Sequence, residues 1–259
     1  GIYSLYLKEF CAENSIKVYI VNPKQSHNLT RALGIRPKTD KIDARTLYKF
    51  HKLIEAKDIK VPKIDQQTKI LSSYLVSYEF ALKQRVALSN HLESLRDKEL
   101  IALMKKDLKR AKKLEDKLFH DILEYVRQNQ NLKEDYQRLL TISGVGEKTA
   151  IALLTLFKTY QGTNRAQITA LAGLDPVRRE SGTSVKNRDK ISKDGKGIYP
   201  KIFSLPTVCA PVHNQKISLF YQRLLAHHKT KKLAVIASMR KILLIAHAMY
   251  RDKTGYVTV

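Results

Sequence analysis

Residues 138–157, RLLTISGVGEKTAIALLTLF, place two apolar segments on either side of a short turn that contains Gly144 and Gly146. This order, with the second segment starting near Glu147, predicts a helix-hairpin-helix. Glycines in such a turn let backbone N–H groups approach a phosphate, and the N-terminus of the following helix adds favourable partial charge. Lys148 would add a cation. The alternative is an ordinary glycine-rich turn between two packed helices.

The region upstream of this stretch, residues 66–137, contains neither glycine nor proline. Apolar residues recur there at helical spacing in two runs, one from Leu71 to Leu95 and one from Leu108 to Tyr125. We interpret the region as a long antiparallel helical hairpin, or coiled coil, that turns near residues 99–106. Such a hairpin would act as a spacer or as an oligomerisation arm.

The first sixty residues have a helix–strand–helix pattern. Residues 17–23, KVYIVNP, are rich in β-branched side chains and end at an Asn-Pro pair, which predicts a short strand. The flanking segments, residues 2–10 and those after Thr39, have helical spacing. Because a single strand cannot make a sheet, this strand either pairs with a distant segment or has its partner strands before Gly1 in a longer chain. We expect the second arrangement.

The charge of the chain points to an anionic partner. Its 259 residues include 48 Lys and Arg against 24 Asp and Glu, a formal net charge of +24. Self-repulsion of this size is relieved best by a polyanion, so nucleic acid is the expected partner. The apolar residues 231–250 are interrupted by Arg240 and Lys241, which indicates a buried helix and no membrane span. The isolated Cys11 and Cys209 argue against a cysteine-based zinc site and suggest a cytoplasmic location.

A basic segment follows the helix-hairpin-helix. Residues 172–197, AGLDPVRRESGTSVKNRDKISKDGKG, carry Ser181 next to a glycine. Cations at this density suit a phosphodiester backbone. A serine hydroxyl beside a glycine can reach a phosphorus atom, and arginines nearby can stabilise the charge that builds on the phosphoryl oxygens. The alternative is a turn within a solvated charged loop.

Two aspartates stand three residues apart in residues 38–44, KTDKIDA. On a helix, the carboxylates of Asp40 and Asp43 share one face. Two hard oxygen ligands at a helix start suit Mg²⁺ held against a phosphate, and Lys38 and Lys41 would bring that phosphate near. The alternative is that Asp40 caps the helix and Asp43 is a surface residue. The histidines show no metal-ligand spacing.

Several blocks of the sequence, taken in order, resemble the DEDD transposases of bacterial insertion sequences, the insertion sequence 110 family, to which the Piv DNA invertase is related. The similar blocks are GIYSLYLKEFCAENSIKVYIVNPKQ, GIRPKTDKIDARTLYKF, LLTISGVGEKTAIALL, ITALAGLDPVRRESGTS, KISKDGKG and KTKKLAVIASMRKILLIAHAM. The similarity runs along almost the whole chain. It departs from the family at IYPKIFSLPTV, residues 198–208, where two prolines interrupt an expected basic helix.

The resemblance implies a fold and a chemistry. It implies a mainly α chain with part of an RNase H-like (RuvC-type) α/β domain in residues 1–60, the helical hairpin in 61–135, and a C-terminal transposase domain in 136–259. In this family four acidic residues bind Mg²⁺, a serine attacks DNA, a structured bridge RNA guides the protein, and the protein acts as a multimer. Asp40 and Asp43 match the last two acidic residues. Ser181 matches the serine, with Ser184 as a rival.

The resulting hypothesis is a DNA transposase or site-specific recombinase that uses Mg²⁺-dependent transesterification with a serine nucleophile. Two of the four acidic ligands have no counterpart, so we expect the chain as given to be inactive. The alternatives are a Holliday-junction-type nuclease that uses metal-activated water, and a non-catalytic RNA- or DNA-binding remnant of a decayed element. Expected partners are DNA, a bridge RNA and further copies of the chain as a dimer or tetramer, without a membrane. The residues predicted to contact nucleic acid are Lys38, Lys41, Gly144, Gly146, Lys148, Arg178, Arg179, Lys186, Arg188, Lys190 and Lys193.

Overall fold

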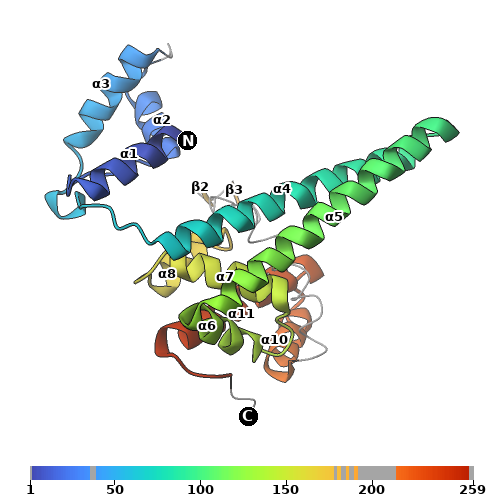
Figure 1. Ribbon diagram of the computed structural model, residues 1–259. Helices are drawn as coiled ribbons and strands as arrows, with labels where there is room; N and C mark the ends of the chain where they lie inside the picture. Colours follow the sequence, from blue (N-terminus) through green and yellow to red (C-terminus); the bar gives the residue numbers. More distant parts are fainter. Residues whose placement is uncertain are drawn as a thin grey trace. The chain divides into compact units, whose positions relative to one another are not determined.

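The computed structural model describes residues 2–35, 39–177, 180–181, 185–186, 190–191 and 214–256. These residues are mainly helical, as predicted, and they divide into two compact units, Gly1–Gln66 and Gln67–Val259 (Figure 1). The predicted boundaries near residues 60 and 135 stay predictions.

The first unit holds three α-helices and a 3₁₀ turn: α1 (Ile2–Glu13), α2 (Pro23–Ala32), α3 (Asp40–His51) and η1 (Ala56–Asp58). Asn22 caps α2 by accepting a hydrogen bond from the Lys24 amide at 2.9 Å. The side chains described in this unit bury little, since only Cys11 and Thr46 are buried among them. Large apolar side chains such as Tyr6 and Leu53 are exposed.

The strand predicted over residues 17–23 is absent. Val18 makes an isolated antiparallel bridge with Lys60, through N–O distances of 3.0 and 3.2 Å, and the described residues offer no further partner. Extended β-branched residues need neighbouring strands to form a sheet, and a single bridge does not supply them. The predicted RNase H-like α/β segment therefore finds no support in the described part of the chain.

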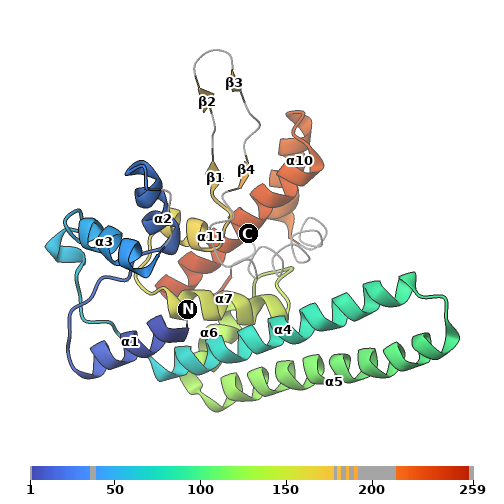
Figure 2. The same cartoon turned by 90° about the horizontal axis from the view of Figure 1, so that it is seen from above.

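The second unit begins with the helical hairpin of α4 (Gln66–Ser94) and α5 (Lys98–Gln128), which run side by side in opposite directions (Figure 2). Ring contacts pair Tyr74 with Tyr125 and Tyr78 with Phe119 across the two helices. The turn lies at residues 95–97, upstream of the predicted 99–106, because Asp97 caps α5 by accepting a hydrogen bond from the Leu100 amide at 2.9 Å.

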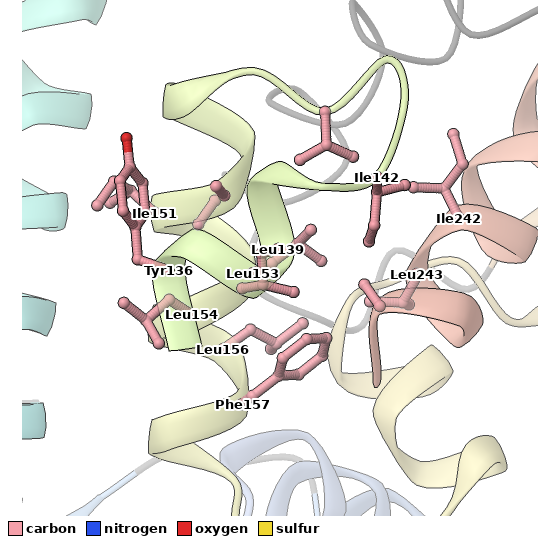
Figure 3. Packing of buried hydrophobic residues seen from close by; sticks show 14 of the residues in the cluster. Tyr136, Leu139, Ile142, Ile151, Leu153, Leu154, Leu156, Phe157, Ile242 and Leu243 are labelled. Carbon is pink, nitrogen blue, oxygen red and sulfur yellow. The ribbon is translucent and has the colours of Figure 1, made fainter. Parts of the chain in front are cut away.

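The hairpin is followed by α6 (Gln130–Leu140), α7 (Glu147–Thr159), α8 (Arg165–Leu171), α10 (Gln215–Ala226) and α11 (Lys231–Asp252). Helix α7 is the centre of the core, since every residue from Thr149 to Phe157 is buried. A helix that is apolar on all sides is stable only when neighbours cover all of it. Figure 3 shows α6 and α11 doing so with Leu139, Ile242 and Leu243, and the core continues into the base of the hairpin at Leu71.

The basic segment after α8 contains two short antiparallel ladders. β1 (Pro176–Val177) pairs with β4 (Lys190–Ile191), and β2 (Glu180–Ser181) pairs with β3 (Val185–Lys186). The pair β2–β3 lies within the sequence enclosed by β1 and β4, whereas the sequence suggested a loop. The register places Ser181 opposite Val185.

Among the described residues, α11 is the one helix whose length and mean hydropathy would allow it to cross a membrane, which is weak support for a span. Its buried residues include Ser238, Ile242 and Ala246, spaced four apart, and Ile242 and Ala246 belong to the core cluster. This spacing is the pattern of a helix with one face in a protein core.

Candidate nucleic-acid interface

The turn between α6 and α7 contains the two glycines that the sequence suggested for phosphate contact, and that contact stays a prediction. Gly144 has φ of +91°, a left-handed conformation that favours glycine. The Val145 amide donates to the Ile142 carbonyl at 2.9 Å, and the Val145 side chain is buried, which anchors the turn to the core.

Gly146 is the N-cap of α7 and leaves the start of that helix open. Among the described residues, no side chain caps the first amides, and no atom lies within 4 Å of the position that a Cβ of Gly146 would occupy. Uncapped amides at a helix start bind anions such as phosphate. Glu147, in the first turn, accepts a hydrogen bond from the Tyr136 hydroxyl at 3.4 Å.

Lys148 lies against the helical hairpin. Its Nζ is 3.7 Å from Oε1 of Glu115, and it lies over the rings of Tyr78 and Phe119 at 5.5 and 5.4 Å from their centroids. Burial lowers the pKa of Lys148, but the hydrogen bond with the Tyr78 hydroxyl and the nearby negative charges outweigh it, so the pKa lies above the usual lysine value. Lys148 therefore stays charged, with its side chain still 56% exposed.

The partner of Lys148, Glu115, is a buried carboxylate that joins three helices. It accepts a hydrogen bond from the Tyr78 hydroxyl at 3.4 Å and is paired with Nε of Arg85, both on α4. Buried carboxylates require such partners. The turn before α7 is thus tied to the hairpin through charged groups, a link that the sequence alone did not indicate.

Asn214, which the sequence analysis missed, braces the other side of the turn. Its side-chain amide donates to the Ser143 carbonyl at 3.3 Å, and its Oδ1 accepts from the Ile217 amide and the Tyr256 hydroxyl. Asn214 is buried and is the N-cap of α10. An asparagine directly before a helical pattern is an N-cap signal, but its contact with a turn 71 residues away is not visible in the sequence.

The residues predicted around the serine are described only in part. Ser181 and Lys186 lie in the inner ladder and Lys190 in the outer one, with backbone positions alone described. Arg178, Arg179, Ser184, Arg188 and Lys193 lie outside the described residues. The proposed roles of all these side chains stay predictions.

The acidic pair lies at the start of α3. Thr39 is the N-cap, since its hydroxyl accepts from the Ile42 amide at 3.3 Å, so Asp40 is in the first turn and is not the cap. Asp40 and Lys41 are exposed, and Asp43 is partly buried; Lys38 lies outside the described residues. Acidic side chains in a first turn also favour the helix through its dipole.

Binding of Mg²⁺ by these two carboxylates stays a prediction. Within the described ranges, no group of three or more His, Cys, Asp or Glu side chains could hold a metal ion. Protein sites for Mg²⁺ usually hold one or two carboxylates together with water and phosphate oxygens. Asp40 and Asp43 belong to the first unit and Ser181 to the second, so their convergence on one phosphate stays a prediction.

A hollow of about 430 Å³ lies beside the same helix. Arg45, Lys49 and Lys52 line it at a spacing that places them on one helix face, and Lys52 lies over the Tyr48 ring at 5.1 Å. Cations therefore line part of the hollow, in addition to the lysines beside the acidic pair.

Comparisons with known proteins agree with a DNA-directed role. Residues 136–222, which include the α6–α7 turn and β1 to β4, match the transposase IS116/IS110/IS902 family. The chain is 29% identical over 265 residues to the pilin gene-inverting proteins of Moraxella lacunata and Moraxella bovis, with 99% of this chain and 79% of each relative covered.

A shorter similarity involves a protein of DNA junctions. The Holliday junction branch migration complex subunit RuvA of Helicobacter hepaticus is 36% identical over 85 residues, which are 32% of this chain and 42% of that protein. Together these similarities support the transposase and DNA-recombinase class.

Proposed function

We propose that this chain is the DNA-binding and catalytic part of a transposase or site-specific recombinase of the insertion sequence 110 family. The observation that carries the proposal is the family match over residues 136–222, because that segment contains both the open α6–α7 turn and Ser181. The net charge of +24 supports a nucleic-acid partner. We propose DNA as substrate, a structured bridge RNA as guide, a homo-oligomeric assembly and a cytoplasmic location.

In the proposed binding mode, the first amides of α7 and the backbone at Gly144 and Gly146 contact a phosphate. Lys148 keeps its charge beside that turn, and the cations of residues 178–193 extend the contact along the backbone. Lys38 and Lys41 would contact a phosphate beside Asp40 and Asp43.

In the proposed chemistry, the hydroxyl oxygen of Ser181 attacks a DNA phosphorus. A new Ser–O–P bond forms, the bond from phosphorus to the deoxyribose oxygen breaks, the serine proton passes to solvent, and the released strand end takes up a proton. Arg178, Arg179 and Arg188 would stabilise the charge on the phosphoryl oxygens. Ser184 is the rival nucleophile.

Mg²⁺ is the proposed cofactor, with Asp40 and Asp43 supplying two of its oxygen ligands. Because two of the four acidic ligands that the family resemblance implies have no counterpart in this chain, we propose that the chain as given binds nucleic acid without cleaving it. An extended protein, in which an added N-terminal segment supplies an Asp and a Glu as the two further ligands, is the form in which we expect activity.

Trapping tests the serine. The extended protein, incubated with Mg²⁺ and supercoiled DNA, should give a protein–DNA adduct that survives denaturant. The Ser181→Ala variant should lose the adduct, while Ser184→Ala should keep it. Loss in Ser184→Ala alone would assign the nucleophile to Ser184. Nicked DNA without any adduct would favour the nuclease alternative, and binding without nicking would favour the non-catalytic alternative.

Gly146 tests the phosphate contact in the chain as given. Aspartate at this position fits the open space and the N-cap conformation, so Gly146→Asp should not weaken the fold. Its carboxylate would occupy the first amides of α7 and repel phosphate. We expect about a tenfold loss of affinity for duplex or four-way DNA, measured by fluorescence anisotropy.

The control is Gly162→Asp, which adds the same charge at another open glycine, beyond the end of α7. Gly162 has φ of +70°, a left-handed conformation that aspartate adopts at some cost, so circular dichroism checks that this variant is folded. Equal affinity losses in both variants would contradict a phosphate contact at the α6–α7 turn, because charge alone would then explain the effect.

A further inference from the structure

The last two helices form a strongly basic part of the chain. No Asp or Glu occurs between Asp194 and Asp252, and the structure describes residues 214–251 of that stretch as α10, a turn and α11. Helix α10 packs against α11. The cations of this pair are Lys216, Arg223, Lys229, Lys231, Lys232, Arg240, Lys241 and Arg251.

The cations are densest at the turn between the two helices. Every residue from Ala226 to Leu233 is exposed, and we call residues 227–232 the α10–α11 turn. Lys229, Lys231 and Lys232 lie in it beside His227 and His228. Within the described part of the chain, none of these three lysines makes an ion pair with a carboxylate.

The backbone of the turn has a defined, hydrogen-bonded conformation. The amides of His228 and Lys229 donate to the carbonyls of Leu225 and Leu224 at 2.9 and 3.1 Å, which ends α10 in a Schellman motif. Thr230 then caps α11. His228 has φ of +54°, a conformation in which glycine is favoured. The turn is therefore closed by hydrogen bonds, although a histidine occupies its left-handed position.

The position of the lysines is electrostatically unfavourable without an anion. Lys231 and Lys232 are in the first turn of α11, and the helix dipole disfavours cations there. Further along the pair, the Phe220 ring holds Lys241 at 4.3 Å and Arg223 at 5.9 Å from its centroid. The cations thus continue from the turn along both helices, which suits a long anion better than a single small one.

We propose that the α10–α11 turn is a contact surface for the phosphodiester backbone of a nucleic acid, additional to the α6–α7 turn. It lies beyond residues 136–222, so the family match does not account for it. The inference rests on the proposed function, because that function supplies the nucleic acid. DNA and RNA share the required chemistry, and the experiment distinguishes them.

The test replaces three lysines in the full chain: Lys229→Gln, Lys231→Gln and Lys232→Gln together. The control replaces three exposed lysines of α5, Lys105→Gln, Lys109→Gln and Lys112→Gln, and so removes the same charge. Affinities for a duplex DNA and for an RNA hairpin are measured over a range of salt concentrations.

We expect the turn variant to lose about 100-fold in affinity near 0.1 M salt and to flatten the salt dependence by about three units of slope. The control should change both by much less. A loss of affinity for duplex DNA alone, for RNA alone or for both supports the proposed contact surface. The probe that is affected identifies which nucleic acid the surface binds.

Three results would overturn the inference. One is unchanged affinity of the turn variant for both probes while the wild-type chain binds them. Another is an equal loss in the α5 control. The third is a loss confined to phosphatidylserine vesicles, which would assign the turn to a membrane. Failure of the wild-type chain to bind either nucleic acid would overturn the proposed function as well.

Discussion

At the scale of single residues, Tyr136 gives a test of how α6 packs on α7. Burial, followed by the charge and hydrogen bond of Glu147, raises the pKa of Tyr136 to about 12. The folded state therefore keeps the tyrosine proton at a pH at which the unfolded chain has lost it. Stability from this group is complete below pH 10 and is lost as the pH rises from about 10 to about 12.

We expect Tyr136→Phe to remove this part of the pH dependence. Between about pH 9 and pH 11.5, urea unfolding of the wild-type protein should lose about 1–2 kcal/mol more than unfolding of the variant. Parallel losses in the two proteins would show that Tyr136 ionises normally in the folded state.

Single residues also show what sequence could and could not reveal about the site. Gly144 and Gly146 were identified because glycines directly before an apolar helix indicate a tight turn. The positive φ of Gly144 agrees with such a turn. Glu115 and Asn214 were missed, since each contacts partners that are far away in the sequence. Charge and capping patterns in the sequence predict local structure and do not identify partners that are distant in the sequence.

At the scale of elements, the network around Glu115 should hold the hairpin to α7. Glu115→Gln removes the charge that pairs with Arg85 and Lys148. We expect a loss of about 2 kcal/mol in the free energy of unfolding. This loss is smaller than the loss on breaking a fully buried ion pair, because both cations are partly exposed and can be hydrated.

The control is Glu124→Gln, which breaks an ion pair with Arg127 at 3.0 Å on the same helix. Both of its side chains are about half exposed, and such pairs contribute below about 1 kcal/mol. Similar losses from the two variants in urea titrations would mean that the Glu115 network does not join the helices.

Elements were predicted best where the pattern was long. The two helices of residues 66–137 lack glycine and proline, and α4 and α5 occupy that region. The strand at residues 17–23 failed because β-branched residues form a strand only with partners. The ladders of residues 176–191 were missed since two-residue strands leave no periodicity.

At the scale of the whole molecule, the two units differ in the core that they contain. The buried apolar cluster draws all of its residues from Leu71 to Met249, and the first unit buries only Cys11 and Thr46 among its described side chains. Hydrophobic burial is the main favourable contribution to folding.

We therefore expect a fragment of residues 67–259 to unfold cooperatively on heating, near the temperature of the full chain. A fragment of residues 1–66 should show no cooperative transition in circular dichroism. A cooperative transition in the short fragment, or its absence in the long one, would show that the core does not determine the stability of each unit.

The central claim is that this chain binds the nucleic-acid backbone, and the salt dependence of DNA binding tests it most directly. Anisotropy titrations of the full chain with a labelled duplex should give a straight line of log affinity against log salt. Six or more phosphate contacts predict a slope of about −5 or steeper and a loss of about 1,000-fold between 50 and 200 mM salt. Absence of binding near 50 mM salt, or a slope close to zero, would contradict the account.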